Sequence, residues 1–399
     1  MTALSDAGGD HVLVVNAGSS SVKLAVLDPA SGRRALTGLA ERVGTPDASV
    51  RIDRDGERST STPDDASHAG VIAALLALMT GDERSSLVAV GHRVVHGGPT
   101  YSSSVVVDDV VRADLEALIP LAPLHLPGNL AGVDAARAAL PDLPQVAVFD
   151  TAFHRTMPSY AAQYAVPKAW RDELDVRRYG FHGTSHRYVS GAAAELLGRP
   201  PGELGLVTLH LGNGCSAAAV RAGRSVDTTM GFTPLEGLVM GSRSGDIDPG
   251  VIPYVAERLG VAAAEVVRRL NTESGLLGVS GTSNDMRTLL EAAAGGDDDA
   301  ALAVELFCYR AAKHVAALSV ALGRLDAVVF TGGIGENSAP VRAAVLARLA
   351  VLGIHLDAEA NEANGAGTGG RISTPGGPVA LVVATDEELL IARDTADLT

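Results

Sequence analysis

The sequence is poor in cysteine, lysine and aromatic residues, and these deficits exclude several classes of protein. Two cysteines, Cys215 and Cys308, among 399 residues supply neither a disulfide framework nor a tetrahedral zinc set. Lysine occurs only at Lys23, Lys168 and Lys313, so arginine carries most of the positive charge. The net charge of −15 argues against nucleic acid and against an anionic membrane surface as partners.

Long apolar segments are also missing. The apolar run "VIAALLALM" is far too short to span a bilayer. The amino-terminal stretch "MTALSDAGGD" lacks the basic and apolar regions of a signal peptide. We therefore expect a cytoplasmic protein with no membrane partner. A chain of 399 residues with 46% hydrophobic content predicts an α/β protein of two domains.

Two common nucleotide and hydrolase motifs are absent. No Gly-Lys pair occurs, which excludes the ordinary P-loop. No G-x-S-x-G occurs either, since "GSRSG" has arginine at its centre, and this excludes the serine-hydrolase elbow. The stretch "GNGCSA" matches the Rossmann pattern G-x-G-x-x-A, but "RAGR" interrupts the helix that this fold requires. We therefore expect a strand hairpin there.

The chain does contain a repeated pattern of strand, small-residue turn and strand. It occurs in "HVLVVNAGSSSVKLAVLD" and again in "GELGLVTLHLGNGCSAAAVRAGRSV", which suggests a duplicated fold. Successive backbone N–H groups in such turns form an anion site without a helix. Each turn by itself is typical of an ordinary β-hairpin. Together with the glycines of "TGGIGEN", they favour a nucleotide triphosphate as ligand.

The remaining segments predict helices that alternate with strands. "SVRIDRDGERSTST" predicts a hairpin around its Asp-Gly pair, and a helix is expected from about His68 to Thr80. Strands are expected in "SLVAVGHRVVHGG" and in "LPQVAVFDTAFH" as far as Phe149. A helix in "AALAVELFCYRAAKHVAALSVALG" precedes a strand in "LDAVVFTGGIGENS", and "PVALVVATDEELLIARDT" reads as a strand entering a helix. This alternation is typical of a parallel sheet with covering helices.

Three arginines lie in or beside turns rich in glycine and serine: Arg93, Arg243 and Arg287. A single arginine of this kind is most often a surface residue. Three of them in an acidic chain favour bidentate binding of an anion.

Two histidines four residues apart, His182 and His186, allow three interpretations. A zinc site lacks the intervening glutamate of H-E-x-x-H and a third ligand, and Gly183 weakens the helix that would align the rings. A buried hydrogen-bonded histidine suits His186, whereas His182 is placed to project into a cleft. Asp150 ends a strand, where it can be a catalytic or metal-linked carboxylate or a helix cap.

With these pieces in view, the chain closely resembles the acetate kinase family, within the superfamily of acetate and sugar kinases, Hsp70 and actin. The matching segments follow the family's order over almost the full length. They are "NAGSSSVKLAVLD", "GHRVVHGG", "FDTAFHRTMP", "YGFHGTSHRYV", "HLGNGCSAAAV", "DTTMGFTPLEGLVMGSRSGDIDPG", "TGGIGENS" and "DEELLIARDT".

The resemblance implies an α/β protein with two duplicated ribonuclease H-like (actin-like ATPase) domains that flank a cleft. The first domain would comprise residues 1–150, completed by a C-terminal helix in 385–399. The second would comprise residues 151–384, with the nucleotide-binding motifs and the dimer interface. The family forms homodimers.

The implied activity is reversible transfer of a phosphoryl group from ATP to acetate, giving acetyl phosphate and ADP, with Mg²⁺ or alternatively Mn²⁺ as the metal. Asn16 and Glu387 would hold the metal. The catalytic residues would be Asp150, His182 and Arg243. The substrate-binding residues would be Arg93, Val95, Leu124, His125, Phe181 and Pro234. The nucleotide-binding residues would be Lys23, His210, Leu211, Gly212, Asn213, Gly214, Asp285, Met286, Arg287, Gly333, Ile334, Gly335, Glu336 and Asn337.

Two positions depart from the family pattern. Leu126 in "PLHLPGN" and Asp386 in "ATDEEL" each stand where asparagine is usual. Asp386 is expected to add charge beside the proposed metal ligand Glu387.

The chemistry of the acceptor limits the role of Asp150. A carboxylic acid is already ionised at neutral pH, so acetate needs no general base to act as nucleophile. We therefore expect Asp150 to orient Arg243 or the water ligands of magnesium. The remaining alternatives are a propionate or butyrate kinase of the same family, a nucleotide-dependent binding module of the superfamily, and a zinc hydrolase.

Overall fold

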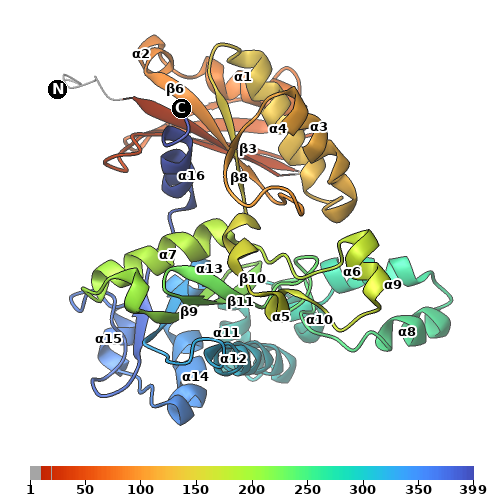
Figure 1. Ribbon diagram of the computed structural model, residues 1–399, viewed down its shortest axis with the longest axis vertical. Coiled ribbons are helices and arrows are strands. Elements are labelled where there is room, and N and C mark those ends of the chain that lie inside the picture. Colours follow the sequence, from red (N-terminus) through yellow and green to blue (C-terminus); the bar gives the residue numbers. More distant parts are fainter. Residues whose placement is uncertain (1–9, 19) are drawn as a thin grey trace. The chain divides into compact units, whose positions relative to one another are not determined.

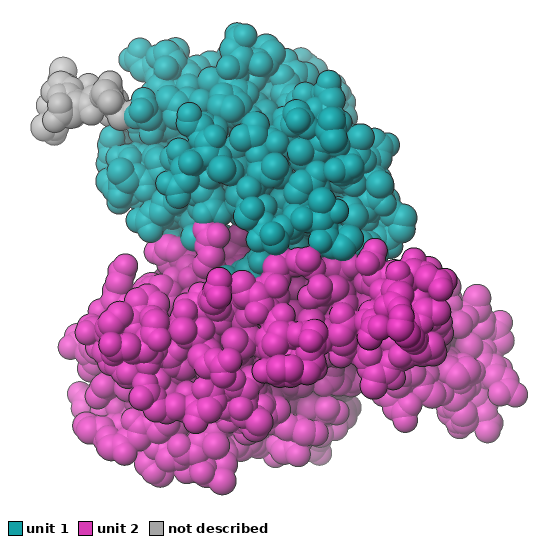
Figure 2. Space-filling view, in the orientation of Figure 1, with its two compact units in different colours: residues 1–153, 386–399 teal, residues 154–385 magenta. Residues whose placement is uncertain are grey.

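The computed structural model describes residues 10–18 and 20–399. Ser19 of the first turn and most of the amino-terminal stretch discussed above lie outside the described residues. The chain forms two compact units (Figure 2). Unit 1 runs to Phe153 and is completed by Asp386–Thr399, and unit 2 is His154–Thr385.

Unit 1 is built on a sheet of which Figure 1 labels β3, β6 and β8. This sheet has eight strands in the order β5-β4-β3-β2-β1-β6-β8-β7. The central strands β1, β2 and β3 are antiparallel, and β6 and β8 continue the sheet parallel to β1. Their bounds are β1 His11–Ala17, β2 Ser21–Leu27, β3 Arg34–Glu41, β4 Ser49–Arg54, β5 Glu57–Ser61, β6 Leu87–Val94, β7 Val105–Val106 and β8 Gln145–Phe149.

Both hairpins expected in unit 1 are confirmed. Strands β1 and β2 pair so that Asn16 lies opposite Lys23. Between β4 and β5, Asp55 and Gly56 have φ angles of 52° and 85°. Positive φ at both central residues is the geometry of the type I′ turn that an Asp-Gly pair favours. The pattern of this pair therefore predicted the turn correctly.

The helices of unit 1 are α1 His68–Ala77, α2 Gly81–Ser85, α3 Asp109–Ala117, α4 Leu126–Ala139 and α16 Glu387–Ala396. Helix α1 buries Val71, Ile72 and Leu75 in the core that also includes strands β1 to β4. Helix α16 lies against β6 at Gly91, where any side chain would collide with Ile391 and Thr395. This close approach places Glu387, the first residue of α16, near the end of β6.

Unit 2 repeats the central topology of unit 1. Its five-stranded sheet has the order β11-β10-β9-β12-β13. The first three strands are antiparallel, and β12 and β13 are parallel to β9, so order and direction match β3-β2-β1-β6-β8. The predicted duplication of an actin-like ATPase fold is confirmed. The bounds are β9 Gly205–Leu211, β10 Cys215–Arg221, β11 Arg224–Thr228, β12 Ala327–Thr331 and β13 Val379–Val382.

The remaining helices belong to unit 2, in which α12 precedes β12 as expected. They are α5 Ser159–Ala162, α6 Lys168–Leu174, α7 Gly183–Leu196, α8 Val251–Leu259, α9 Ala263–Thr272, α10 Gly275–Ser280, α11 Met286–Ala294, α12 Asp298–Ser319, α13 Gly332–Asn337, α14 Ala339–Arg348 and α15 Ala358–Glu362. None of the helices in the described part of the chain is both long and apolar enough to cross a membrane.

Candidate active site

In unit 1, Arg93 and Asp150 form a two-pronged ion pair. Arg93 donates from Nε to Asp150 Oδ1 at 2.9 Å and from Nη2 to Oδ2 at 2.6 Å. Strands β6 and β8 are parallel neighbours, and Arg93 and Asp150 lie at their carboxyl ends. The Asp150 carboxylate is only 1% exposed. The pair uses one edge of the guanidinium, which leaves the N–H groups of Nη1 oriented for a second acceptor.

Glu387 lies beside this pair, with Oε2 3.8 Å from Arg93 Nε. Burial by itself lowers the pKa of Arg93, but the charges of Asp150 and Glu387 outweigh it and raise that pKa above its usual range. Two carboxylates thus lie next to one guanidinium at the carboxyl end of the unit 1 sheet.

The donor set proposed for the metal is one carboxylate and one amide oxygen. Glu387 is 23% exposed, and Asn16, near the end of β1, is partly exposed beside Lys23 on β2. Mg²⁺ is usually held by one or two protein oxygens and keeps water and phosphate oxygens in its other positions. Asn16 and Glu387 therefore fit this cation.

The two departures from the family pattern have structural explanations. Asp386 caps α16 by accepting from the Leu389 N–H at 2.9 Å, and Arg34 Nη2 lies 2.6 Å from the same oxygen. The additional charge expected at the metal site is therefore paired with Arg34. Leu126 is fully buried in the apolar cluster around α4, where an asparagine side chain would need a hydrogen-bond partner.

In unit 2, His182 and Arg243 converge on the turn between β9 and β10. A Cβ atom at Gly214 would lie 3.3 Å from His182 Nε2 and 3.4 Å from Arg243 Nη2. The glycine therefore allows both side chains to approach the same point. The loop with Arg243 is held against this turn, since the Gly241 N–H donates to Asn213 O at 2.9 Å.

Arg243 is a cation that the described part of unit 2 does not neutralise. Its Nη1 donates to the carbonyl oxygen of Pro234 at 2.7 Å, and no carboxylate among the described residues is paired with it. Burial lowers the pKa of its guanidinium. A partly buried positive charge without a carboxylate partner is a site for an anion.

His182 is held by hydrogen bonds at the start of α7. It has a positive φ of 55°, and its Nδ1 lies 2.8 Å from Ser216 Oγ. One helical turn later, His186 is fully buried, with Nδ1 2.7 Å from Thr208 Oγ1 and Nε2 2.8 Å from Ser216 Oγ. His186 thus has the contacts of a structural histidine.

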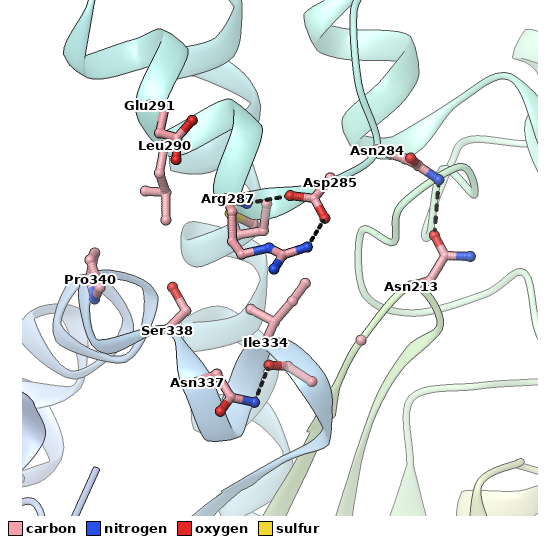
Figure 3. Close-up of a pocket in the computed structure, with 13 residues that line it drawn as sticks. Asn213, Asn284, Asp285, Arg287, Leu290, Glu291, Ile334, Asn337, Ser338 and Pro340 are labelled. Carbon is pink, nitrogen blue, oxygen red and sulfur yellow. Dashed lines mark hydrogen bonds and ion pairs between the residues drawn. The ribbon is translucent and has the colours of Figure 1, made fainter. Parts of the chain in front are cut away.

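A cavity of about 660 Å³ opens beside the same turn (Figure 3). Its size is within the range of small-molecule sites. Three segments line it: the β9–β10 turn, the start of α11, and α13 with the residues that follow it. Eight of the residues expected to bind nucleotide are on its wall: Gly212, Asn213, Asp285, Met286, Arg287, Gly333, Ile334 and Asn337.

The other residues expected to bind nucleotide are not on this wall, among the residues described. They are Lys23, His210, Leu211, Gly214, Gly335 and Glu336. Lys23 belongs to unit 1. Glu336 has a supporting position, because its Oε1 accepts from the Gly332 N–H at 2.9 Å and from the Thr385 N–H at 3.2 Å.

The cavity also has lining residues that sequence reasoning missed: Asn284, Leu290, Glu291, Ser338 and Pro340. Leu290 and Glu291 follow Arg287 by three and four positions on α11, so helical spacing would have indicated them. Asn284 donates from Nδ2 to Asn213 Oδ1 at 3.3 Å, which links two walls of the cavity.

The residues other than Arg93 that are expected to bind the substrate are divided between the units. Val95, Leu124 and His125 belong to unit 1, and Phe181 and Pro234 belong to unit 2. Leu124 is 63% exposed, whereas Phe181 is 1% exposed. Sequence reasoning missed Asn129, whose amide accepts from the Val95 N–H at 2.9 Å and donates to the Ala17 carbonyl at 2.5 Å. The segment "PLHLPGN" ends at Asn129, but the sequence did not indicate that its side chain links these two backbone groups.

Two copies of the actin-like ATPase topology, with a cavity lined by glycine-rich turns in one of them, define a nucleotide-binding protein of the actin-like ATPase class. A model of the acetokinase family matches residues 11–393. The chain therefore belongs to the acetokinase family, as the motifs predicted.

Individual relatives agree with this assignment. The chain is 57% identical over 385 residues to the acetate kinase of Deinococcus radiodurans, covering 96% of this chain and 97% of that protein. Among solved structures, a propionate kinase from Francisella tularensis is 43% identical with a TM-score of 0.93, covering 98% of this chain and 100% of that one. Porphyromonas gingivalis acetate kinase is 42% identical with a TM-score of 0.91 and the same coverage of both chains.

Proposed function

We propose that the protein catalyses the reversible, Mg²⁺-dependent transfer of the terminal phosphoryl group of ATP to acetate, giving acetyl phosphate and ADP. The observation that carries this proposal is the convergence of His182 and Arg243 on Gly214. Gly214 belongs to the same turn as Gly212 and Asn213, which line the cavity. Two hydrogen-bond donors thus adjoin the place where a nucleotide would put its phosphates.

The acceptor would be held by Arg93. Acetate is ionised at neutral pH, so its carboxylate is both the nucleophile and a ligand for a guanidinium. Asp150 occupies Nε and one N–H of Nη2, and it fixes the orientation of the remaining donors. We assign Asp150 to orienting Arg93, because a carboxylate that already accepts two charged hydrogen bonds is poorly suited to take a proton.

The main barrier to the reaction is repulsion between an anionic acceptor and a polyanionic donor. In-line phosphoryl transfer depends mostly on positioning and on neutralising charge at the equatorial oxygens. Arg243 lacks a carboxylate partner among the described residues, so its charge is available for these oxygens. His182 would donate a second hydrogen bond from Nε2.

Asn16 and Glu387 would hold Mg²⁺, which when bound compensates the charge of the phosphate oxygens. Lys23, opposite Asn16 in the β1–β2 pair, would add a positive charge near those phosphates. Mn²⁺, which favours similar oxygen ligands, would serve as an alternative metal.

A propionate or butyrate kinase is the second candidate function. It is favoured by the similarity to a propionate kinase, with a TM-score of 0.93. One methylene in an apolar pocket changes binding by only about 1–3 kcal/mol, so acids of neighbouring length should overlap as substrates.

Trapping the product with hydroxylamine tests this proposal. Purified protein is incubated with MgATP, hydroxylamine and acetate, propionate or butyrate, and the acyl hydroxamate is measured. We expect formation to be fastest with acetate, slower with propionate and slowest with butyrate. A preference for propionate would favour the second candidate. Absence of hydroxamate from every acid, in protein that still binds ATP, would indicate a nucleotide-dependent binding module.

We further propose that the protein works as a homodimer in the cytoplasm, where ATP is available. Helix α8 exposes Val251, Tyr254 and Leu259, with Tyr254 59% and Leu259 54% exposed. Exposed apolar side chains gathered on one helix are suited to a subunit interface. Sedimentation analysis of the protein and of Tyr254→Asp would test this, since a monomeric parent protein would contradict the proposal.

A further inference from the structure

The hydroxyl group of Ser216 lies between two imidazole rings. Its Oγ is 2.8 Å from His182 Nδ1 and 2.8 Å from His186 Nε2. The local fold explains this position: His182 and His186 are one turn apart at the start of α7, and Ser216 and Thr208 lie on paired strands β10 and β9. Ser216, His186 and Thr208 are all fully buried.

A hydroxyl group has one hydrogen, and among the described residues the Ser216 hydroxyl has no hydrogen-bond partner besides the two rings, so it donates to one of them. The other ring must then donate its own N–H to the serine oxygen. Two directions are therefore open to the chain Thr208–His186–Ser216–His182. They differ in which nitrogen of His182 has the proton.

In the first direction, Thr208 donates to His186 Nδ1, His186 Nε2 donates to Ser216, and Ser216 donates to His182 Nδ1. Neutral His182 then has its proton on Nε2, the nitrogen near Gly214. In the reverse direction, His182 donates from Nδ1 and His186 donates to Thr208. Thr208 must then turn its hydrogen to the Ala218 carbonyl.

The distances favour the first direction. Thr208 Oγ1 is 2.7 Å from His186 Nδ1 but 3.4 Å from the Ala218 oxygen. A hydroxyl hydrogen gains more from the shorter bond. Burial, the leading cause, and the nearby rings of His154 and His210 hold the pKa of His186 well below its usual value. His186 is therefore neutral and has a single N–H to give.

We propose that Thr208, His186 and Ser216 are positioning residues that fix the Nε2–H tautomer of His182. This inference rests on the proposed function, in which His182 Nε2 donates to the phosphoryl group. It implies that the His182 ring is neutral when it donates this hydrogen bond. No positive charge is then added beside His210, whose ring centroid is 4.4 Å away, or beside Arg243.

The direct test is ¹⁵N NMR of the ring nitrogens in the full-length protein labelled at histidine, at pH 8 and without substrate. His182→Gln identifies the His182 signals. We expect Nε2 protonated and Nδ1 bare, with a shift of Nδ1 in Ser216→Ala because its hydroxyl donor is lost. A proton on Nδ1, or signals of His182 that do not change in Ser216→Ala, would overturn the proposal.

Steady-state kinetics test whether the positioning of His182 matters for phosphoryl transfer. Ser216→Ala should lower kcat about tenfold, because it removes one hydrogen bond to His182. The KM values for ATP and for acetate should change less than twofold. Ser190→Ala is the matched control, because Ser190 is a buried serine on α7 whose hydroxyl, among the residues that the structure describes, bonds within its own helix to the Arg187 carbonyl at 2.9 Å.

The control should keep both the wild-type kcat and the wild-type His182 signals. An unchanged kcat in Ser216→Ala would refute the positioning role. The NMR result needs no turnover, so it remains interpretable even if no acyl hydroxamate is formed and the proposed function fails.

Discussion

At the scale of single residues, the two arginines differ in how their charge is compensated. Arg93 is surrounded by the carboxylates of Asp150 and Glu387, whereas Arg243 bonds only to a backbone carbonyl among the described residues. Arg93 is thus a rigid, oriented group suited to hold a small carboxylate. Arg243 is an available charge suited to the moving phosphoryl group.

Arg93→Ala should therefore affect the acceptor more than the nucleotide. A charged hydrogen bond contributes about 1.5–3 kcal/mol, so we expect the KM for acetate to rise roughly 10- to 100-fold. The KM for ATP should change little. Steady-state kinetics with each substrate varied in turn would measure this, and an increase confined to the KM for ATP would contradict the assignment.

Asp150→Asn tests whether this carboxylate orients Arg93 or moves a proton. If it orients, the variant should lose activity while its kcat keeps the same dependence on pH, because no proton-transferring group has been removed. The KM for acetate should also rise in this variant. A kcat profile that loses an ionisation present in the parent protein would show that Asp150 acts as a base.

The sequence indicated both Arg93 and Asp150 but not their pairing. The residues are 57 positions apart and meet because β6 and β8 are parallel neighbours in the sheet. Single-sequence patterns do not specify which strands become neighbours. Ser216 was missed for a similar reason, since a serine in a strand of small residues has no distinguishing motif.

At the scale of elements, the short helix α13 depends on Glu336. The carboxylate holds the turn before α13 by accepting from Gly332 and Thr385, and Thr331 Oγ1 lies 3.2 Å from the same oxygen. Gly332 has a positive φ of 78°. The resemblance predicted Glu336 as a nucleotide-binding residue, whereas its hydrogen bonds support the turn.

Glu336→Ala should raise the Kd for ATP roughly tenfold or more, because the turn loses the hydrogen bonds that this carboxylate accepts from Thr331, Gly332 and Thr385, each contributing about 1 kcal/mol. Glu336→Gln keeps the accepting oxygen and should retain most of the affinity. Titration of ATP into both variants would measure the difference. Equal losses in the two variants would mean that the negative charge, rather than the hydrogen bonds, is what matters.

Hairpins and long helices were predictable because their signals are local. The Asp-Gly pair specified the β4–β5 turn, and the helix in "AALAVELFCYRAAKHVAALSVALG" was confirmed as α12. The buried Arg342 could not be foreseen. It donates to the carbonyls of Gly335 and Glu336 at the end of α13, and nothing in the sequence marks an arginine as internal.

At the scale of the whole molecule, buried histidines make stability depend on pH. Burial lowers the pKa of His92, in unit 1, and of His154, in unit 2, to about 4. In the unfolded chain each would titrate near 6.5. The unfolded state thus binds more protons between these values, and the free energy of unfolding must fall as the pH falls from about 6.5 to 4.

At pH 5 each histidine should contribute on the order of 2 kcal/mol less stability than at pH 7. Urea unfolding at the two pH values would measure the loss. His154→Gln, which can still donate to the Phe181 carbonyl, should reduce the difference by about that amount. A variant with the same pH dependence as the parent protein would show that His154 is not the source.

Duplication of the five-stranded core also explains why the proposed groups come from distant parts of the sequence. Arg93, Asp150 and Glu387 belong to one copy, and His182, Arg243 and the cavity belong to the other. We propose that the positive charges of Arg93 and Arg243, together with a hydrogen bond from His182, offset the repulsion between the acceptor and the phosphates, and that Arg243 contributes most of this effect.

The most direct test is to measure kcat and ATP binding on the same preparation of Arg243→Ala. We expect kcat to fall on the order of 10³-fold, as for other arginines that stabilise a transferring phosphoryl group, while the Kd for ATP changes only a few-fold. Near-normal turnover in this variant would contradict the claim.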